Sequence, residues 1–281
     1  MRQKRCLTIQ DYSCLGRCSL TVALPILSAA SLEAVGLPTA ILSNHTAYKD
    51  WTFVDLSDEM EKSIEMWREY NHHFDVIYTG YLTTDQIDIT YRIIQKLKEK
   101  DTKVMIDPAC ADNGKLYPGF KENHMEEMKK LLSIADMTCP NMTEACFLTD
   151  HPYHGESISY EEAVSIAKDL SKLGPSIILL TGVIFKEGTI GCLIYEKEKE
   201  EISLYETNCL PINFHGAGDS FCSAFVGAYE RGKSVYQSVK IAHDFVHRAM
   251  QRSYDNHVDG ILYGLEFEPE LSSYIKDLEA E

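Results

Sequence analysis

Short apolar segments alternate with longer amphipathic segments along most of the chain. The apolar segments predict strands at residues 6–10, 39–43, 76–78, 104–106, 137–138 and 176–180. The segments between them place apolar side chains at helical spacing and predict helices at residues 19–34, 58–70, 84–99, 124–134 and 160–173. A chain that alternates in this way favours an α/β fold, with a mainly parallel central sheet and helices on both faces.

The alternation changes after residue 190. Two short strands, 192–195 and 202–207, flank a charged turn and predict an antiparallel hairpin at an edge of the sheet. Helices at 219–231 and 235–253 follow, and then an acidic tail with one short helix. Residues 36–38, Gly-Leu-Pro, are expected to separate the first helix from the second strand. No repeat or flexible linker interrupts the chain, so we predict one domain over residues 1–281.

Charge excludes several classes of partner. The formal net charge of −16 and a pI of about 5.0 leave no basic footprint for a nucleic acid or an acidic membrane. No apolar run is long enough to span a membrane, and the first residues lack the apolar core of a secretory signal. The nine cysteines are scattered and form no CxxC pair, which predicts reduced thiols and a cytoplasmic protein.

Residues 213–221, Asn-Phe-His-Gly-Ala-Gly-Asp-Ser-Phe, carry the most specific local signal. Small residues at the start of a helix let the backbone approach a ligand, and the first amides of a helix attract an anion. We predict that the amides of Gly216, Ala217 and Gly218 form an anion hole for a phosphoryl group, with Asp219 as the base. A simple turn with a helix cap is the alternative interpretation of the same residues.

Three further carboxylates, Asp107, Asp112 and Glu144, follow predicted strands. In an open α/β sheet such positions lie at the ligand-binding edge, where oxygen ligands suit Mg²⁺. Because Mg²⁺ usually keeps several waters, Glu144 is expected to act partly through water. Taken singly, each carboxylate would more often be an ordinary surface group than part of a metal site.

Several motifs, in the same order, resemble those of one kinase group. Residues 216–219 are similar to the Gly-Ala-Gly-Asp signature of the ribokinase-like superfamily, and residues 140–145 to its Asn-x-x-Glu motif. Residues 106–117 resemble a segment of pyridoxal and pyridoxamine kinases, in which Asp-Pro precedes Asp-Asn-Gly-Lys-Leu-Tyr. Residues 43–48 and 80–82 resemble the family segments that contact the B6 ring. The resemblance covers roughly residues 5 to 255.

The resemblance implies a ribokinase-like three-layer fold and ATP-dependent phosphorylation of the hydroxymethyl group of pyridoxal, pyridoxamine or pyridoxine. It implies ATP and Mg²⁺ as cofactors and a homodimer as the assembly, and it leaves a monovalent-cation requirement open. The site residues carried over are the substrate-binding Asp11, His45, Thr46 and Tyr81, the nucleotide-binding Asp107, Asn141, Thr181 and Gly182, the metal-organising Asp112 and Glu144, and the catalytic Asp219 with Gly216, Ala217 and Gly218.

Two departures from the family leave the substrate open. Asp11 stands where relatives usually present a serine, and residues 16–19, Gly-Arg-Cys-Ser, replace a glycine-rich turn. A carboxylate at residue 11 would suit a protonated ring nitrogen or an amine, as in pyridoxamine or in the aminopyrimidine of thiamin biosynthesis. The alternatives are therefore a hydroxymethylpyrimidine kinase, a more distant sugar or nucleoside kinase, and a catalytically silent B6-binding module, which the presence of Asp219 disfavours.

Overall fold

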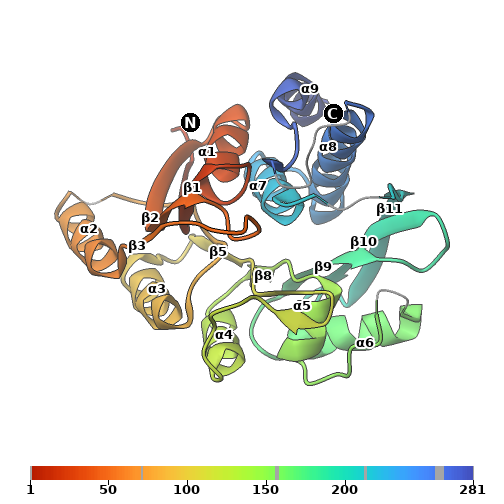
Figure 1. Cartoon of the computed structure of the whole chain (residues 1–281), viewed down its shortest axis with the longest axis horizontal. Coiled ribbons are helices and arrows are strands. Elements are labelled where there is room, and N and C mark those ends of the chain that lie inside the picture. The colour runs from red at the N-terminus through yellow and green to blue at the C-terminus, as the bar shows by residue number, and fades with distance from the viewer. Residues whose placement is uncertain (1, 71, 156–157, 212–213, 257–262, 281) are drawn as a thin grey trace. The chain divides into compact units, whose positions relative to one another are not determined.

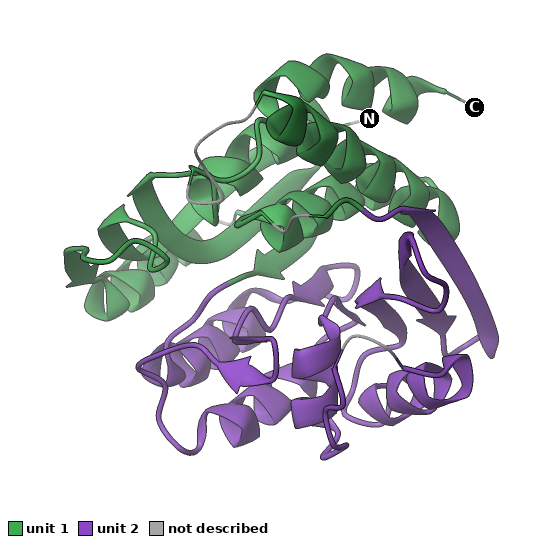
Figure 2. Ribbon diagram, turned by 45° about the vertical axis from the view of Figure 1, so that its right-hand side comes forward, with its two compact units in different colours: residues 1–80, 210–281 green, residues 81–209 purple. Residues whose placement is uncertain are grey.

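The computed structural model describes residues 2–70, 72–155, 158–211, 214–256 and 263–280 (Figure 1). The chain forms two compact units, which Figure 2 colours separately. Unit 1 combines residues 1–80 with 210–281, and unit 2 comprises residues 81–209. The single domain predicted for residues 1–281 stays a prediction.

Unit 1 contains four strands in the order β4-β1-β2-β3. They are β1 (Arg5–Leu15), β2 (Glu33–Asn44), β3 (Phe53–Asp55) and β4 (Val76–Thr79). The strands β4, β1 and β2 pair in parallel, whereas β3 runs antiparallel to β2 at the edge. The sequence pattern did not predict β3, since three residues are too few to show a period.

Strand β2 is longer than the predicted strand at residues 39–43, since it begins at Glu33 and includes residues 36–38. Pro38 lies opposite Gln10, beside a register shift between Gln10 and Tyr12 of β1. Strand β3 pairs with Ala40–Leu42 and does not pair with the proline. A proline is tolerated at such an irregular position because no regular ladder bond requires its missing N–H.

The helices of unit 1 pack on one another through small residues. They are α1 (Leu20–Ala29), α2 (Ser57–Glu69), α7 (Ala217–Glu230), α8 (Val235–Asp255), η2 (Glu268–Glu270) and α9 (Leu271–Glu279). Helix α1 contacts β1, β2 and α7, and α7 contacts α8. A Cβ atom on Gly227 of α7 would lie 2.4 Å from the Tyr274 hydroxyl and 2.6 Å from Ala30 Cβ, so this close approach requires glycine.

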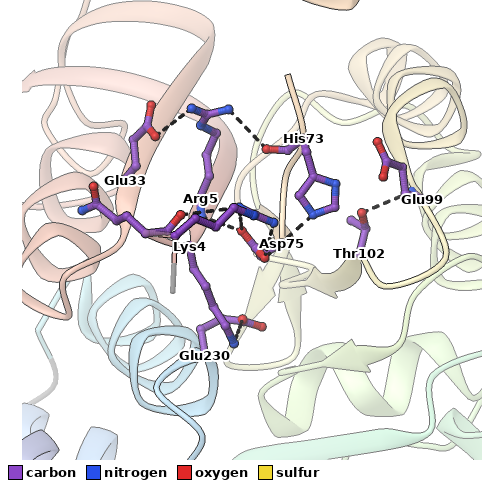
Figure 3. Close-up of polar contacts among 10 residues, drawn as sticks. Lys4, Arg5, Glu33, His73, Asp75, Glu99, Thr102 and Glu230 are labelled. Carbon is purple, nitrogen blue, oxygen red and sulfur yellow. Dashed lines mark hydrogen bonds and ion pairs between the residues drawn. The ribbon is translucent and has the colours of Figure 1, made fainter. Parts of the chain in front are cut away.

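Charged side chains gather at the amino ends of the unit 1 strands (Figure 3). Asp75 accepts hydrogen bonds from the guanidinium of Arg2 at 2.9 Å and from the backbone N–H of Arg5 at 2.8 Å. Arg5 forms an ion pair with Glu33, and Lys4 forms one with Glu230 of α7. These ion pairs lie at the amino ends of the parallel strands, whereas ligand sites in such sheets form at the carboxyl ends.

The larger sheet of unit 2 contains, among the described residues, five strands in the order β5-β8-β9-β10-β11. They are β5 (Lys103–Ile106), β8 (Met137–Thr138), β9 (Ile177–Val183), β10 (Thr189–Glu196) and β11 (Glu201–Asn208). The first three pair in parallel, and β10 with β11 forms the antiparallel edge hairpin. The predicted α/β fold with mainly parallel strands and an antiparallel edge hairpin is confirmed.

Unit 2 also holds a small separate hairpin and four helices. The hairpin is β6 (Ala111–Asp112) with β7 (Lys115–Leu116), and the helices are α3 (Thr84–Leu97), α4 (His124–Leu132), α5 (Met142–Leu148) and α6 (Tyr160–Leu170). Helix α5 was not predicted as a helix because seven residues show little periodicity. Its capping box, in which Asn141 and Glu144 exchange hydrogen bonds, is the signal that could have revealed it.

Across the described ranges, none of the helices combines the length and the apolar character needed to cross a membrane. All nine cysteines carry free thiols, and most are buried.

Candidate active site

The start of helix α7 supplies the first part of the candidate site, in unit 1. Gly216 is the N-cap in a left-handed conformation, with φ of 77°, and the helix begins at Ala217, two residues earlier than predicted. The carbonyl of Gly216 accepts both the N–H of Ser220 at 2.9 Å and its hydroxyl at 2.7 Å. Asn213, part of the same motif, lies outside the described residues.

The two glycines of this motif differ in their surroundings. A Cβ atom on Gly216 would lie 2.0 Å from the carbonyl oxygen of Arg17, so only glycine fits. Gly264 presses on the same oxygen, which a Cβ atom there would approach to 2.7 Å. A Cβ atom on the exposed Gly218 would meet no heavy atom within 4 Å. The space beside Gly218 is therefore open to a ligand.

The first amides of α7 face this open space. The N–H of Ala217 donates to the carbonyl of Phe214 at 3.4 Å, so one of the three predicted amides has a protein acceptor. Within the described ranges, the amides of Gly218 and Asp219 have no acceptor. Two unpaired amides at a helix N-terminus form a binding site for an anion such as a phosphoryl group.

Asp219 lies in the first turn of α7 with a half-buried side chain. Its Oδ2 accepts the backbone N–H of Ser19 at 2.9 Å, and Oδ1 has no hydrogen-bond partner in the described part of the chain. Burial raises the pKa of Asp219 to about 6, the Ser19 amide opposes the rise, and the charge of Asp11 adds to it. A carboxylate with this pKa is ionised at pH 7 and is a stronger base than an exposed aspartate.

Asp11 is buried beside Asp219, in β1. Its Oδ1 accepts the hydroxyl of Ser19 at 2.6 Å, and its Oδ2 accepts the hydroxyl of Ser13 at 2.8 Å. Burial raises the pKa of Asp11, and the two hydroxyl hydrogen bonds oppose that rise. Both oxygens are thus engaged by the protein, and the predicted contact of Asp11 with substrate stays a prediction.

His45 and Thr46 follow β2 in unit 1. Thr46 is exposed, whereas His45 is buried and packs against Gly16, where a Cβ atom would lie 2.4 Å from the imidazole Cδ2. The N–H of Ala47 donates to His45 Nδ1 at 3.3 Å, which places the proton of the neutral ring on Nε2.

An aromatic cluster surrounds His45, and sequence reasoning missed most of it. The His45 ring centroid lies 4.9 Å from that of Tyr48 and 5.2 Å from that of His215. The Tyr48 ring lies 6.3 Å from Tyr263 in an edge-to-face arrangement. Residues this distant in sequence leave no periodic signal, so only the structure shows that these rings form one cluster.

In unit 2, Glu144 and Asn141 join the loops that follow β5 and β8. Glu144 is buried, and its Oε1 accepts the amides of Cys110 at 2.8 Å and Ala111 at 3.3 Å. Its Oε2 accepts the amide of Asn141 at 2.9 Å. The side chain of Asn141 accepts the Glu144 amide at 3.0 Å and donates to the Ala111 carbonyl at 2.8 Å. Both side chains therefore hold the loops in place.

Two of the predicted magnesium-site carboxylates, Asp107 and Asp112, lie in the segment after β5, near the Glu144 hydrogen bonds. Asp112 is exposed, whereas Asp107 is buried and accepts the amide of Ala109 at 3.2 Å. The described residues include no group of three or more His, Cys, Asp or Glu side chains placed to hold a metal. Oε2 of Glu144 accepts only one amide and could still accept a water. These oxygens would fit Mg²⁺ held chiefly by phosphates and water, and the predicted role of Asp112 stays a prediction.

Thr181 and Gly182 lie inside β9, which continues to Val183 beyond the predicted strand end. The N–H and the hydroxyl of Thr181 both donate to the Pro140 carbonyl, at 3.0 and 3.2 Å. Gly182 has φ of 72°, and a Cβ atom there would meet nothing within 4 Å. Nucleotide contact by these two residues stays a prediction.

Tyr81 begins a stack of rings in unit 2. Its ring lies 5.6 Å from Phe120, which lies 3.8 Å from the buried ring of His124. Nδ1 of His124 is 2.9 Å from the hydroxyl oxygen of Thr84, and burial lowers the His124 pKa to about 4. The imidazole is therefore neutral at pH 7, and Phe120 emerges as a support for Tyr81 that no sequence spacing indicated.

Replacing Glu144 with glutamine is expected to lower the free energy of unfolding by about 1–3 kcal/mol. The amide group of glutamine would turn a donor toward backbone N–H groups that now donate to Glu144. Urea unfolding of Glu144→Gln would measure the loss, with the exposed Glu161→Gln on α6 as the matched control. Equal stability of the two variants would contradict the structural role.

Comparison with known proteins adds a family match. The sequence profile described as phosphomethylpyrimidine kinase matches residues 27–260. The chain is 26% identical over 234 residues to pyridoxal kinase PdxY of Granulibacter bethesdensis, covering 78% of this chain and 79% of that protein. It is 28% identical to pyridoxal kinase of Ovis aries, and that match spans 63% of this chain and 58% of the ovine protein.

A thiamine biosynthetic bifunctional enzyme of Arabidopsis thaliana is also similar, at 29% identity over 65% of this chain and 34% of the plant enzyme. The curated relatives therefore include both vitamin B6 and thiamine enzymes.

Solved structures match over nearly the whole chain. The crystal structure of a Bacteroides thetaiotaomicron protein described as a phosphomethylpyrimidine kinase has a TM-score of 0.93 and 32% identity, covering 100% of this chain and 96% of that one. Pyridoxal kinase from Lactobacillus plantarum has a TM-score of 0.89 and 25% identity, covering 98% of each chain. These likenesses confirm the predicted ribokinase-like fold.

Proposed function

This chain belongs to the phosphomethylpyrimidine kinase family, and from that membership we propose that it transfers the γ-phosphoryl group of ATP to the hydroxymethyl oxygen of a vitamin B6 compound. It is a phosphotransferase related to the pyridoxal kinases. The observation that carries the proposal is the unpaired pair of amides at the start of α7, directly beside the carboxylate of Asp219.

In the proposed reaction, Oδ1 of Asp219 accepts the proton of the substrate hydroxyl as its oxygen attacks the γ-phosphorus. The new O–P bond forms while the bond to the bridging oxygen of ADP breaks, and the proton remains on Asp219. The amides of Gly218 and Asp219 stabilise negative charge on the transferring group. Mg²⁺, when bound with the nucleotide, neutralises phosphate charge.

The choice of a B6 compound rests on the relatives and on the aromatic cluster. A second crystal form of the Bacteroides protein, obtained with pyridoxal, is 32% identical to this chain and has a TM-score of 0.90. A pyridine ring with polar edges also suits the rings of His45 and Tyr48. Hydroxymethylpyrimidine, a flat ring with the same hydroxymethyl group, is the second candidate, because thiamine enzymes are also relatives.

A substrate panel tests the proposal. ATP consumption would be measured with pyridoxal, pyridoxamine, pyridoxine, hydroxymethylpyrimidine and ribose, with and without Mg²⁺. We expect kcat/KM for one B6 compound to exceed that for hydroxymethylpyrimidine at least about tenfold, roughly the effect of one well-placed polar contact. The reverse order would establish the pyrimidine as substrate. Binding of B6 compounds without ATP consumption would indicate a silent binding module.

A cytoplasmic location is part of the proposal. Nine free cysteines, most of them buried, suit a reducing compartment, and we place the reaction in the cytoplasm.

A homodimer is part of the proposal. Tyr12, Ile41 and Val54 lie in register on β1, β2 and β3, and their exposed fractions are 41%, 43% and 56%. Registered residues on adjacent strands point to the same face, so they form an exposed apolar row. Such a row, beside the edge strand β3, suits contact with a second copy.

Replacing Ile41 with aspartate is expected to convert the dimer to a monomer, because the interface would then bury an unpaired charge. Light scattering coupled to gel filtration would show the mass fall from twice 31.9 kDa to 31.9 kDa. The control is Ile275→Asp on α9, where the isoleucine is 38% exposed. A monomeric wild-type protein would contradict the proposed homodimer and would leave the kinase assignment unaffected.

A further inference from the structure

The backbone of Ser19 adopts a conformation that residues with side chains rarely take. Its φ is 50° and its ψ is −132°, a combination that glycine tolerates far better. Ser19 is also the N-cap of α1, yet its hydroxyl does not cap the helix. Both features disfavour folding, and strained residues of this kind cluster at functional sites.

Asp11 holds Ser19 in this conformation. The Ser19 hydroxyl that would ordinarily cap α1 donates instead to Asp11 Oδ1 at 2.6 Å. Ser13 fixes the other oxygen of Asp11 at 2.8 Å, and Asp11 and Ser19 are each only 4% exposed. The anchor of the Ser19 backbone is therefore itself rigid and shielded from water.

The same backbone conformation directs the N–H of Ser19 at Asp219. This N–H donates a hydrogen bond to Asp219 Oδ2 at 2.9 Å, and Asp219 Oδ1 has no partner among the described side chains and amides. A carboxylate rotates readily about its Cβ–Cγ bond unless one oxygen is held by a hydrogen bond. Holding Oδ2 therefore also fixes the position of Oδ1. The orientation of the base thus depends on the Ser19 amide.

We propose that Asp11 is a positioning residue for phosphoryl transfer, which acts through Ser19 to fix the Asp219 carboxylate with Oδ1 toward the substrate hydroxyl. This inference rests on the proposed kinase function. It replaces direct substrate contact as the role of Asp11, since that carboxylate is only 4% exposed and each of its oxygens already accepts a hydroxyl hydrogen.

Charge supports the arrangement. Asp11 and Asp219 interact unfavourably as like charges, which contributes to the raised pKa of Asp219. The other titratable groups near the pair are Cys18, whose pKa is raised chiefly by burial, and His45, whose charge would lower the pKa of Asp11. Asp11 therefore strengthens the base as well as orienting it.

A double-mutant cycle on kcat tests the route through Ser19. Asp11→Asn is expected to lower kcat about tenfold, because small misplacements of a reacting group cost rates of that order. Ser19→Gly keeps the N–H and tolerates the backbone conformation without the hydroxyl anchor. In the Ser19→Gly background, Asp11→Asn should therefore lower kcat clearly less than in the wild type, by about threefold or less, because only the charge effect on the Asp219 pKa remains.

Direct substrate contact by Asp11 predicts a different result. Asp11→Asn would then raise the KM for the B6 compound by the same factor in both backgrounds, and that outcome would overturn the proposal. The exposed Asp101→Asn in unit 2 is the control for loss of one carboxylate, and thermal unfolding verifies that each variant is folded.

An NMR measurement separates this inference from the kinase assignment because it needs no turnover. The amide proton of Ser19 should shift with pH in step with Asp219 ionisation, with a midpoint of about 6. In Asp11→Asn this shift should shrink and the amide should exchange with solvent at least tenfold faster. An unchanged Ser19 amide would refute the inference even if the enzyme is active. If no compound of the substrate panel caused ATP consumption but the Ser19 amide responded to pH and to Asp11→Asn as expected, only the kinase assignment would be refuted.

Discussion

Replacing Asp219 with asparagine is expected to lower kcat by about 10²- to 10⁴-fold, the usual contribution of a general base. Asparagine keeps the shape of the side chain and can still accept the Ser19 amide, but it cannot take the hydroxyl proton. The affinity for ATP should change less than about threefold, since the amides of α7 are retained. Steady-state kinetics and calorimetric titration with ATP would measure both quantities.

The pH profile provides a second measurement of the same role. Because the pKa of Asp219 is raised to about 6, the base is ionised above that pH and protonated below it. The wild-type kcat/KM should therefore fall as the pH decreases through about 6, and the residual kcat/KM of Asp219→Asn should lack this limb. Asp101→Asn should retain both the wild-type rate and its pH profile. An Asp219→Asn variant with most of the wild-type rate would exclude Asp219 as the base.

Alanine substitutions at Gly216 and Gly218 should differ in their effects on stability. Gly216→Ala places a Cβ atom 2.0 Å from the Arg17 carbonyl, at a φ of 77°. Strain and overpacking together should lower the free energy of unfolding by about 2–4 kcal/mol, with loss of activity. Gly218→Ala meets no protein atom within 4 Å, so its stability should stay within about 0.5 kcal/mol.

Activity is the second readout for this pair. In Gly218→Ala, the new methyl group would occupy space that the transferring phosphoryl group is proposed to use, and kcat/KM should fall at least about tenfold. Thermal unfolding and ATP consumption, measured on the same preparations, would separate the two effects. A fully active Gly218→Ala would mean that the phosphoryl group lies elsewhere.

Much of the fold was predictable because its signals are local. The alternation of apolar and amphipathic segments located most strands and helices, and the charged turn between residues 196 and 201 located the edge hairpin. The first turn of α7 was predictable for the same reason, since Gly216 and Asp219 lie within one short segment. Strand β2 was misjudged because only its pairing with β1 shows that Pro38 falls beside a bulge.

The site was less predictable where it depends on contacts between distant residues. The predicted substrate contact of Asp11 stays a prediction, and only coordinates show its oxygens accepting the hydroxyls of Ser13 and Ser19. The predicted metal role of Glu144 also stays a prediction, and only coordinates show the three backbone amides that donate to it. No spacing rule relates Tyr81 to Phe120, because their contact depends on how separate loops pack.

The Ser19–Asp219 hydrogen bond joins residues 200 positions apart. During synthesis, the turn that carries Ser19 leaves the ribosome long before its carboxylate partner exists, and all of unit 2 is made in between. Contacts of such high sequence separation form late and slowly. A nascent chain released before residue 219 therefore lacks the proposed base, so incomplete products would hold no assembled phosphoryl-transfer site.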